Sequence, residues 1–303
     1  MSLDEKTKAV EISPVSTNTD GYTTPTLAPN TNTLDNEPNT PSLTTLENLQ
    51  VLPKILREGI LFIASAPALM LQAAHPALNS PTSSSSNLQS DLPATLNSTL
   101  SYIAALVFGT REEKAALLGR LRLAQPPFLT PSTSGNEDAQ LWVLATVYAT
   151  ATHVYQRVYG TFDFRTSEAS YVEFGLVLMH LSPTLLAPGS WPSSRAKFWS
   201  YFDETVANLS VSAAAQDFAS SLPNRDDLPK SMSLTKPVLR AVTIEMLPEN
   251  VRSGYGLQST VGSRTMYSTA MGLLKPVYPV LPGGWKREHV EFYLGEVRRV
   301  INA

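Results

Sequence analysis

Apolar residues recur at helical spacing through most of the chain, from about Leu46 to Ala303. The strongest pattern is "AQLWVLATVYATATHVYQRVY", residues 139–159, in which apolar or aromatic residues occur on every side of the helical period. Such a helix is buried at the centre of a fold, because it leaves no face for water. Alternating strand patterns are scarce. The pattern therefore predicts an all-α protein built around this helix.

The stretch "FGTREEKAALLGRLRLAQPPF", residues 108–128, contains both a helix start and a helix stop. Thr110 and Glu113 match a capping box, and Gly109 is placed to end the preceding helix. The prolines after Gln125 end the new helix at about residue 124. Further helices are expected at 59–74, 93–108, 168–182, 194–220, 234–247, 261–274 and 286–302.

The first 45 residues differ in composition from the remainder of the chain. Residues 1–45 are rich in Thr, Asn and Pro and contain no Phe or Trp. A segment of this kind buries too little apolar surface to offset its ordering entropy, so we expect a disordered tail. Residues 46–303 are expected to form one helical domain, with loops at 79–93 and 129–138.

Composition and charge narrow the possible classes of protein. A hydrophobic content of 43% supplies a sizeable core, and a net charge of −3 gives no sign of nucleic-acid binding. The absence of cysteine excludes disulfides, thiolate metal sites and thiol nucleophiles. The segment 59–74 is shorter than the ~20 residues of a membrane span and contains Pro67. We therefore expect a soluble, cytoplasmic protein that does not span a membrane; its oligomeric state stays open.

Five stretches, taken in order, resemble the latex-clearing-protein or rubber-oxygenase-like domain family, which includes the membrane-bound oxygenase of the mycophenolic acid pathway. The resemblance covers roughly residues 50–303. The stretches are "LMLQAAHPAL" (69–78), "LVFGTREEKAALLGRLRLAQ" (106–125), "EDAQLWVLATVYATATHVYQR" (137–157), "WPSSRAKFWSYFDETVANL" (191–209) and "IEMLPENVRSGYGL" (244–257).

The resemblance implies a globin-like helical bundle that holds haem b, in a family with members that cleave isoprenoid double bonds oxidatively. It places Thr99 at the family's threonine, Thr95 where the family has arginine, and Gln125 where it has the haem-ligating histidine. An amide is a poor ligand for iron, and enzymes of this kind rely on an axial imidazole. The resemblance therefore predicts a scaffold that has lost its haem and has no cofactor, with haem b as the alternative.

Two histidines have more than one interpretation. His75 either pins the chain where it leaves a helix or contacts a substrate. His153 has three interpretations. It is a hydrogen-bonded core histidine, or, because the pKa of histidine is easily tuned, it is a substitute haem ligand or a general acid/base. If haem is retained, His153 or His75 would be its ligand. The other two histidines, His180 and His289, occur in less diagnostic contexts, and no HExxH or HxH pair is present.

The remaining candidate site residues are hydroxyl-bearing and aromatic. Thr95, Thr99 and Tyr102 share one helical face and serve either in local hydroxyl-to-backbone bonds or as donors into a pocket. Gln125 joins Thr95, Thr99 and His153 as a predicted catalytic residue. The predicted substrate-binding residues, which are otherwise plain core, are His75, Tyr102, Trp142, Tyr148, Thr152 and Tyr155.

No serine-nucleophile elbow, phosphate loop, dinucleotide fingerprint or aspartate-rich magnesium pair occurs in the chain. The resemblance implies that a scaffold of this family without haem keeps a large apolar cavity, so we expect a hydrophobic small-molecule substrate and a cofactor-free cyclase of the Diels–Alder type, in which orientation supplies much of the rate. The resemblance also implies the context, in which the enzyme would act on a terpenoid or polyketide intermediate in fungal secondary metabolism. Two alternatives stay open: a haem b oxygenase acting on an isoprenoid, and a non-catalytic binder of a hydrophobic metabolite.

Overall fold

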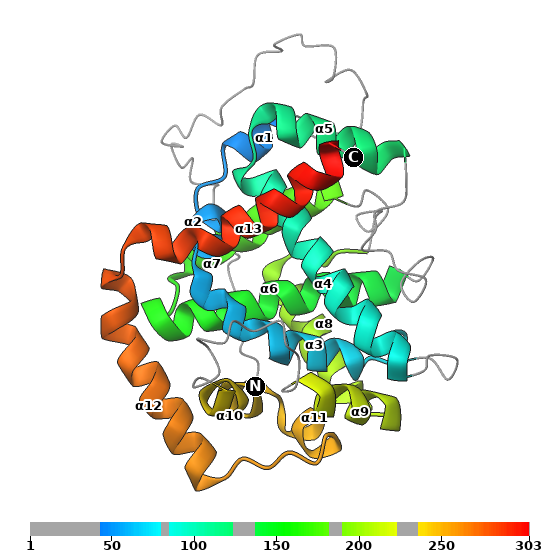
Figure 1. Ribbon diagram of the computed structural model, residues 1–303, viewed down its shortest axis with the longest axis vertical. Helices are drawn as coiled ribbons and strands as arrows, with labels where there is room; N and C mark the ends of the chain where they lie inside the picture. Colours follow the sequence, from blue (N-terminus) through cyan, green and yellow to red (C-terminus); the bar gives the residue numbers. More distant parts are fainter. Residues whose placement is uncertain (1–42, 80–84, 124–136, 182–189, 223–235, 303) are drawn as a thin grey trace, which may run out of the picture. The chain divides into compact units, whose positions relative to one another are not determined.

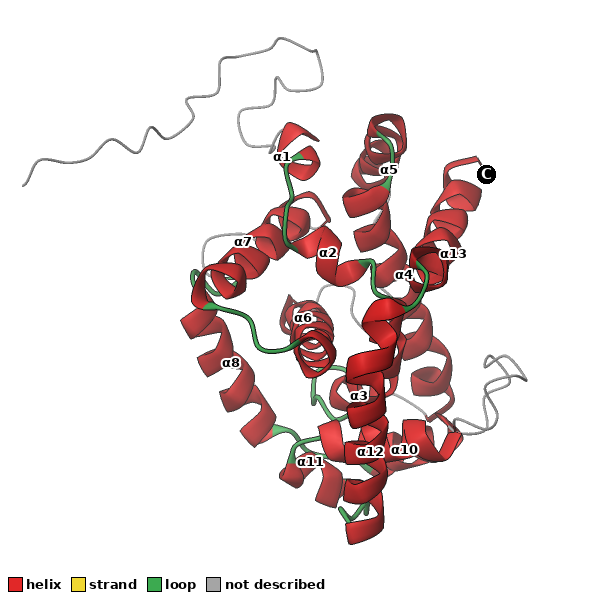
Figure 2. Cartoon of the chain, turned by 90° about the vertical axis from the view of Figure 1, so that its left-hand side faces the viewer, coloured by secondary structure: helices red, strands yellow, loops and turns green. Residues whose placement is uncertain are grey.

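A computed structural model describes residues 43–79, 85–123, 137–181, 190–222 and 236–302. Within these ranges every regular element is a helix, which confirms the predicted all-α class (Figures 1 and 2). None of these helices combines the length and apolarity that crossing a bilayer requires. Their bounds are α1 (Leu43–Glu47), α2 (Leu52–Leu56), the 3₁₀ helix η1 (Gly59–Ala64), α3 (Ser65–Ala73), α4 (Ser85–Phe108), α5 (Arg111–Leu123), α6 (Glu137–Tyr159), α7 (Phe164–Leu181), α8 (Arg195–Asn208), α9 (Ala213–Ser221), α10 (Lys236–Met246), α11 (Glu249–Gly254), α12 (Val261–Val277), the short 3₁₀ helix η5 (Tyr278–Val280) and α13 (Gly283–Asn302).

The central helix is α6, as its all-round apolar pattern predicts. It packs against α2, α3, η1 and α12, and in Figure 2 it is seen nearly end-on among the other helices. Trp142 and Ala145 are completely buried, and so is Thr146. Most of this helix thus occupies the interior, and its exposed residues are confined to its first turn, His153 and Arg157.

A second packing layer is formed by α4, which contacts α3, α9 and α13. It begins at Ser85, so the predicted loop over 79–93 is wrong from residue 85 onward, and residues 80–84 lie outside the described part. Pro93 lies inside the helix. Leu92 and Leu96 on either side of it are buried. Burial of these leucines outweighs the loss of one backbone hydrogen bond at the proline.

The start of α5 follows the predicted capping box. The Thr110 N–H donates to Glu113 Oε2 over 2.9 Å, and the Glu113 N–H donates to Thr110 Oγ1 over 3.2 Å. Gly109 was expected to end the preceding helix, as a left-handed glycine cap does. Its φ is not positive, however: among the described residues the glycines with positive φ are Gly160 and Gly256. A Cβ at Gly109 would lie 2.5 Å from the Ala105 carbonyl oxygen, so the position requires glycine for close approach.

The single helix expected over 194–220 is two helices, α8 and α9. Each begins at a serine: Ser194 Oγ accepts from the Lys197 N–H, and Ser212 Oγ accepts from the Ala215 N–H. Between them the Ser210 N–H donates to the Ala74 carbonyl, which joins this turn to the end of α3. The prediction failed here because the helical pattern continues across the serine cap.

The described chain begins with α1, at Leu43 rather than at the predicted boundary of residue 46. Leu43 is buried, as is Leu46. The predicted tail up to residue 42 lies outside the described residues. The following helix, α2, is fixed to α7 by the Glu173 carboxylate, which accepts from the backbone N–H groups of Gln50, Val51 and Leu52 over 2.7–3.1 Å. This carboxylate satisfies the free donors at the start of α2.

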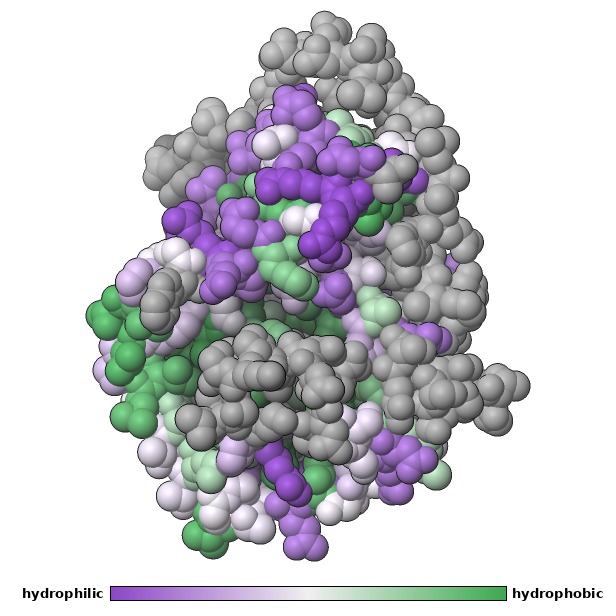
Figure 3. Space-filling view, in the orientation of Figure 1, coloured by the Kyte–Doolittle hydropathy of each residue, from purple (hydrophilic) through white to green (hydrophobic). Residues whose placement is uncertain are grey.

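One helix, α12, packs more loosely than the others. Only Met271 among its residues is buried, and the helix contacts α10, α6 and η5. Leu273 and Val277 are exposed, as is Val280 just beyond the helix, and apolar side chains gather over this part of the surface in Figure 3. The apolar surface of α12 is therefore only partly used in the packing of the described chain.

Candidate functional site

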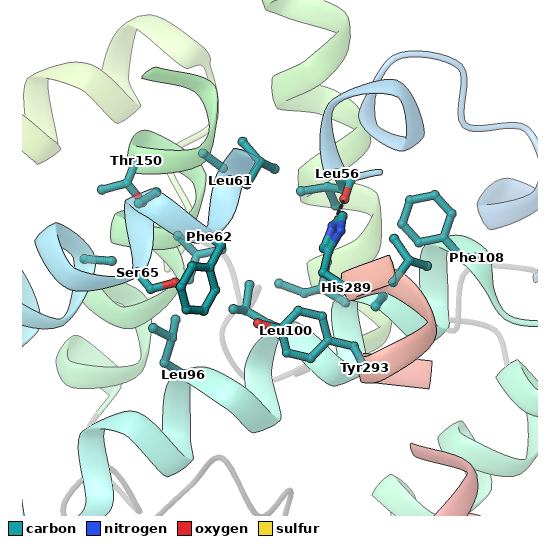
Figure 4. Close-up of a pocket in the computed structure, with 17 residues that line it drawn as sticks. Leu56, Leu61, Phe62, Ser65, Leu96, Leu100, Phe108, Thr150, His289 and Tyr293 are labelled. Carbon is teal, nitrogen blue, oxygen red and sulfur yellow. Dashed lines mark hydrogen bonds between the residues drawn. The ribbon is translucent and has the colours of Figure 1, made fainter. Parts of the chain in front are cut away.

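An apolar pocket lies among η1, α3, α4, α6 and α13 (Figure 4). It is a cavity of about 70 Å³ within a hollow of about 690 Å³ that includes open solvent. Phe62 lines it and is 43% exposed, which marks the side that reaches solvent. The lining residues are Leu56, Leu61, Phe62, Ala64, Ser65, Ala68, Leu96, Leu100, Ile103, Ala104, Phe108, Val147, Thr150, Ala151, His289, Val290 and Tyr293.

The polar side chains among the lining residues are those of Ser65, Thr150, His289 and Tyr293. Thr150 Oγ1 donates to the Thr146 carbonyl over 2.7 Å, so its proton is already used. His289 Nε2 lies 2.9 Å from the Leu56 carbonyl oxygen (Figure 4). A carbonyl only accepts, so Nε2 carries the proton and Nδ1 presents a lone pair. This Nδ1 is buried and has no partner.

Tyr293 lies one helical turn after His289 on α13 and also lines the pocket. The two rings meet edge to face, with centroids 6.3 Å apart. Burial raises the pKa of Tyr293 to about 12, so its hydroxyl keeps its proton at neutral pH. The pocket wall therefore carries a protonated phenol and an imidazole on neighbouring turns of α13.

The predicted residues of α4 are buried together on one face, but that face is not the pocket wall. Thr99 Oγ1 donates to the Thr95 carbonyl over 2.7 Å, and Thr95 Oγ1 is buried without a partner. Burial raises the pKa of Tyr102 to about 12. The pocket is lined instead by the neighbouring positions Leu96 and Leu100, about 100° further around the helix.

Trp142 holds α6 to α3. Its Nε1–H donates to the Leu71 carbonyl over 3.0 Å, and its ring stacks on both His75 and Phe202. It is 0% exposed. These contacts are those of a core residue, and Trp142 does not line the apolar pocket.

The other predicted substrate-binding residues of α6 likewise pack into the protein. The Tyr148 hydroxyl lies 3.0 Å from Ser170 Oγ, and Thr152 Oγ1 donates to the Tyr148 carbonyl over 2.7 Å. Tyr155 stacks on Tyr159, with ring centroids 4.6 Å apart. The pocket takes its α6 wall from Val147, Thr150 and Ala151.

His75 lies at a second, polar hollow. Its Nδ1 accepts from the Ala77 N–H over 3.3 Å, and its Nε2 lies 3.6 Å from Asp138 Oδ2. Burial lowers the pKa of His75, and the Asp138 carboxylate partly opposes that change. Both ring nitrogens are therefore engaged with protein groups. The hollow is lined by His75, Pro76, Asp138, Tyr201, Glu204, Thr205, Asn208 and Leu209.

The lowered pKa of His75 predicts a loss of stability in acid. Below its ordinary pKa of 6.5, the unfolded chain protonates His75 more readily than the folded chain does, so the free energy of unfolding falls as the pH falls. We expect urea unfolding to show a larger loss across this range for the wild type than for His75→Asn, whose amide oxygen still accepts from the Ala77 N–H. Equal losses in the two proteins would show that His75 does not contribute.

The remaining two predicted catalytic residues lie away from the pocket or outside the described chain. His153 is exposed on α6 and does not line the pocket. Gln125 lies outside the described residues. The replacement of the family's haem-ligating histidine by Gln125 therefore stays a prediction, as do the catalytic roles of Thr95, Thr99 and His153.

The pocket residues match haem b in one respect and differ from its needs in two. His289 Nδ1 is a suitable donor, because a ligating histidine normally gives its other N–H to a carbonyl or carboxylate. However, the lining residues that the structure describes include no arginine or lysine to pair with the propionates, and a cavity of about 70 Å³ is small for a macrocycle. As they are arranged, these residues do not fit haem. In the described ranges, no three His, Asp or Glu side chains come together in a way that would hold a metal ion.

Sequence reasoning missed His289 and Tyr293. Their helix returns to α4 and η1 from the far end of the chain, so the pocket is a tertiary arrangement with no local motif. The spacing of the two residues by four along a helix was visible, but it does not distinguish a pocket wall from a surface.

The described part of the chain is an all-helical fold with an apolar pocket. The family model described as ER-bound oxygenase mpaB/B′/Rubber oxygenase, catalytic domain, matches residues 53–275, and the chain belongs to that family. This result confirms the resemblance seen in the sequence.

Two curated relatives are similar to part of the chain. The uncharacterized proteins Mb2261 of Mycobacterium bovis and Rv2237 of Mycobacterium tuberculosis are each 25% identical over 123 residues. The alignment covers 38% of this chain and 47% of each relative, so the chain spans about half the length of the curated relatives it matches. No solved structure matches the chain.

Proposed function

We propose that this protein is an enzyme that binds an apolar small molecule in the α3–α4–α6–α13 pocket and cyclises it without a redox cofactor. The observation that carries the proposal is the lining, in which apolar side chains surround a single imidazole and a single phenol. Pockets of this composition bind hydrophobic molecules and orient them through a few polar groups. Membership of a catalytic-domain family supports an enzymatic role.

An intramolecular cycloaddition suits such a site, because it needs orientation more than chemical groups. Three π bonds of a diene and a dienophile become two σ bonds and one π bond, with no atom or electron exchanged with a cofactor. Walls from several helices would hold the two ends of the substrate in near-attack geometry. The protonated Tyr293 hydroxyl would donate to a carbonyl on the dienophile and stabilise the charge that develops there. The substrate class we propose is a terpenoid or polyketide intermediate of fungal natural-product biosynthesis.

The proposal is tested by two measurements on protein purified from haem-replete cells. We expect no stoichiometric Soret band, and we expect faster cyclisation of linear triene precursors without oxygen or added cofactor. A stoichiometric Soret band that disappears in His289→Ala or His153→Ala would overturn the cofactor-free mechanism. Binding of the precursors without acceleration would favour a non-catalytic binder.

A second candidate is an oxygenase that acts on an isoprenoid with haem b. The family description, which names two oxygenases, favours it. It requires product formation that depends on oxygen, whereas the cyclase works equally well under nitrogen. The same precursor assay therefore separates the two candidates when it is run with and without oxygen.

A further inference from the structure

The His289 ring is held in one orientation by contacts on both sides. Its Nε2–H donates to the Leu56 carbonyl at the end of α2, 233 residues away in sequence. The Nδ1 edge of the ring lies close to Gly59, the first residue of η1, where a Cβ would be 3.4 Å from His289 Nδ1 and 3.1 Å from the Lys286 carbonyl oxygen. Because glycine has no side chain, Gly59 places no side-chain atom against Nδ1.

The lone pair on His289 Nδ1 is an unused hydrogen-bond acceptor. This atom is buried, and among the residues that the structure describes no donor reaches it. A buried acceptor left without a partner costs stability, and buried polar groups are usually paired with protein, water or ligand. The imidazole lies among apolar side chains, including Leu100 and Val290. A ligand that is mostly hydrocarbon but has one O–H donor matches this combination.

We infer that the pocket selects an apolar ligand bearing a hydroxyl, phenol or enol group, whose O–H donates to His289 Nδ1. This inference rests on the proposed function, because it takes the apolar pocket as the substrate site, and it adds the polar group by which the substrate is recognised. The fixed tautomer makes His289 an acceptor, so a methyl ether of the same ligand has nothing to donate. Discrimination between an alcohol and its methyl ether is therefore the signature of this contact.

Geraniol and geranyl methyl ether are the probe pair, because they share one isoprenoid skeleton and differ at the O–H. Isothermal titration of the full chain is expected to show geraniol binding about 3- to 10-fold more tightly than the ether, the range expected for one hydrogen bond. In His289→Gln the amide N–H still reaches the Leu56 carbonyl, but the Nδ1 lone pair is gone. The preference for geraniol should then disappear, while the ether binds as before.

His180→Gln is the matched control, because it makes the same replacement at a histidine of α7 whose ring also lies 2.9 Å from a backbone carbonyl, that of Leu176, but which does not line the pocket. It should keep the preference. The ¹⁵N resonances of His289 give an independent readout, in which Nδ1 is unprotonated and shifts when geraniol is added. Equal binding of the two probes, with no effect of His289→Gln, would overturn the inference and leave the proposed pocket intact. Failure of both probes to bind would overturn the pocket proposal and the inference with it.

Discussion

Replacing Trp142 with alanine is expected to lower the free energy of unfolding by about 3–5 kcal/mol, the range for a fully buried aromatic side chain. Trp142 is 0% exposed and stacks on His75 and Phe202. Its loss would leave a cavity at the contact between α3 and α6, and would remove the partner of the Leu71 carbonyl. Urea unfolding monitored by circular dichroism gives the change in free energy.

Trp199→Ala is the control for this prediction, because Trp199 is half-buried at the edge of the same aromatic cluster. It should cost less than Trp142→Ala. Trp142→Phe separates the two contributions, since it keeps most of the ring volume but not the N–H donor. A cost below about 1 kcal/mol for Trp142→Ala would mean that the indole is not a core residue.

Filling the pocket should prevent binding. Ala104 is 6% exposed and lines the cavity of about 70 Å³. Leucine at this position would occupy the space that a ligand needs, and overpacking of this kind typically costs about 1–3 kcal/mol. We therefore expect Ala104→Leu to weaken geraniol binding on the order of 10-fold or more, as measured by isothermal titration.

Ala196→Leu makes the same change at an exposed position on α8 and should leave binding unchanged. If Ala104→Leu does not fold, Leu100→Trp fills the pocket from a half-buried position on the same helix. Full geraniol affinity in a folded pocket-filling variant would place the ligand elsewhere.

Local signals predicted those parts of the fold that depend on a few neighbouring residues. The all-round apolar pattern of 139–159 predicted the buried α6, and Thr110 with Glu113 predicted the start of α5. The start of α4 was missed because burial of side chains such as Leu92 outweighs the helix-breaking tendency of Pro93. Tertiary packing decided this case, and it is not visible in local propensity.

The site was harder to predict than the fold. The pocket uses α4 and α6, the helices that carry most of the predicted residues, but through Leu96, Leu100 and Val147 rather than Thr95 or Tyr148. Its imidazole and phenol come from α13, which meets η1 only after the chain has folded. A single sequence gives the helical faces, but it does not show which of two buried faces encloses a cavity.

The most direct test of the pocket as the ligand site is methyl NMR of the full chain, labelled at leucine and valine, during titration with geraniol. We expect the largest chemical-shift changes at methyl groups that line the pocket, those of Leu96, Leu100, Val147 and Val290. Leu46 and Val177 are buried elsewhere in the core and should not move. Shifts centred on Leu209, beside the polar hollow at His75, would contradict the account.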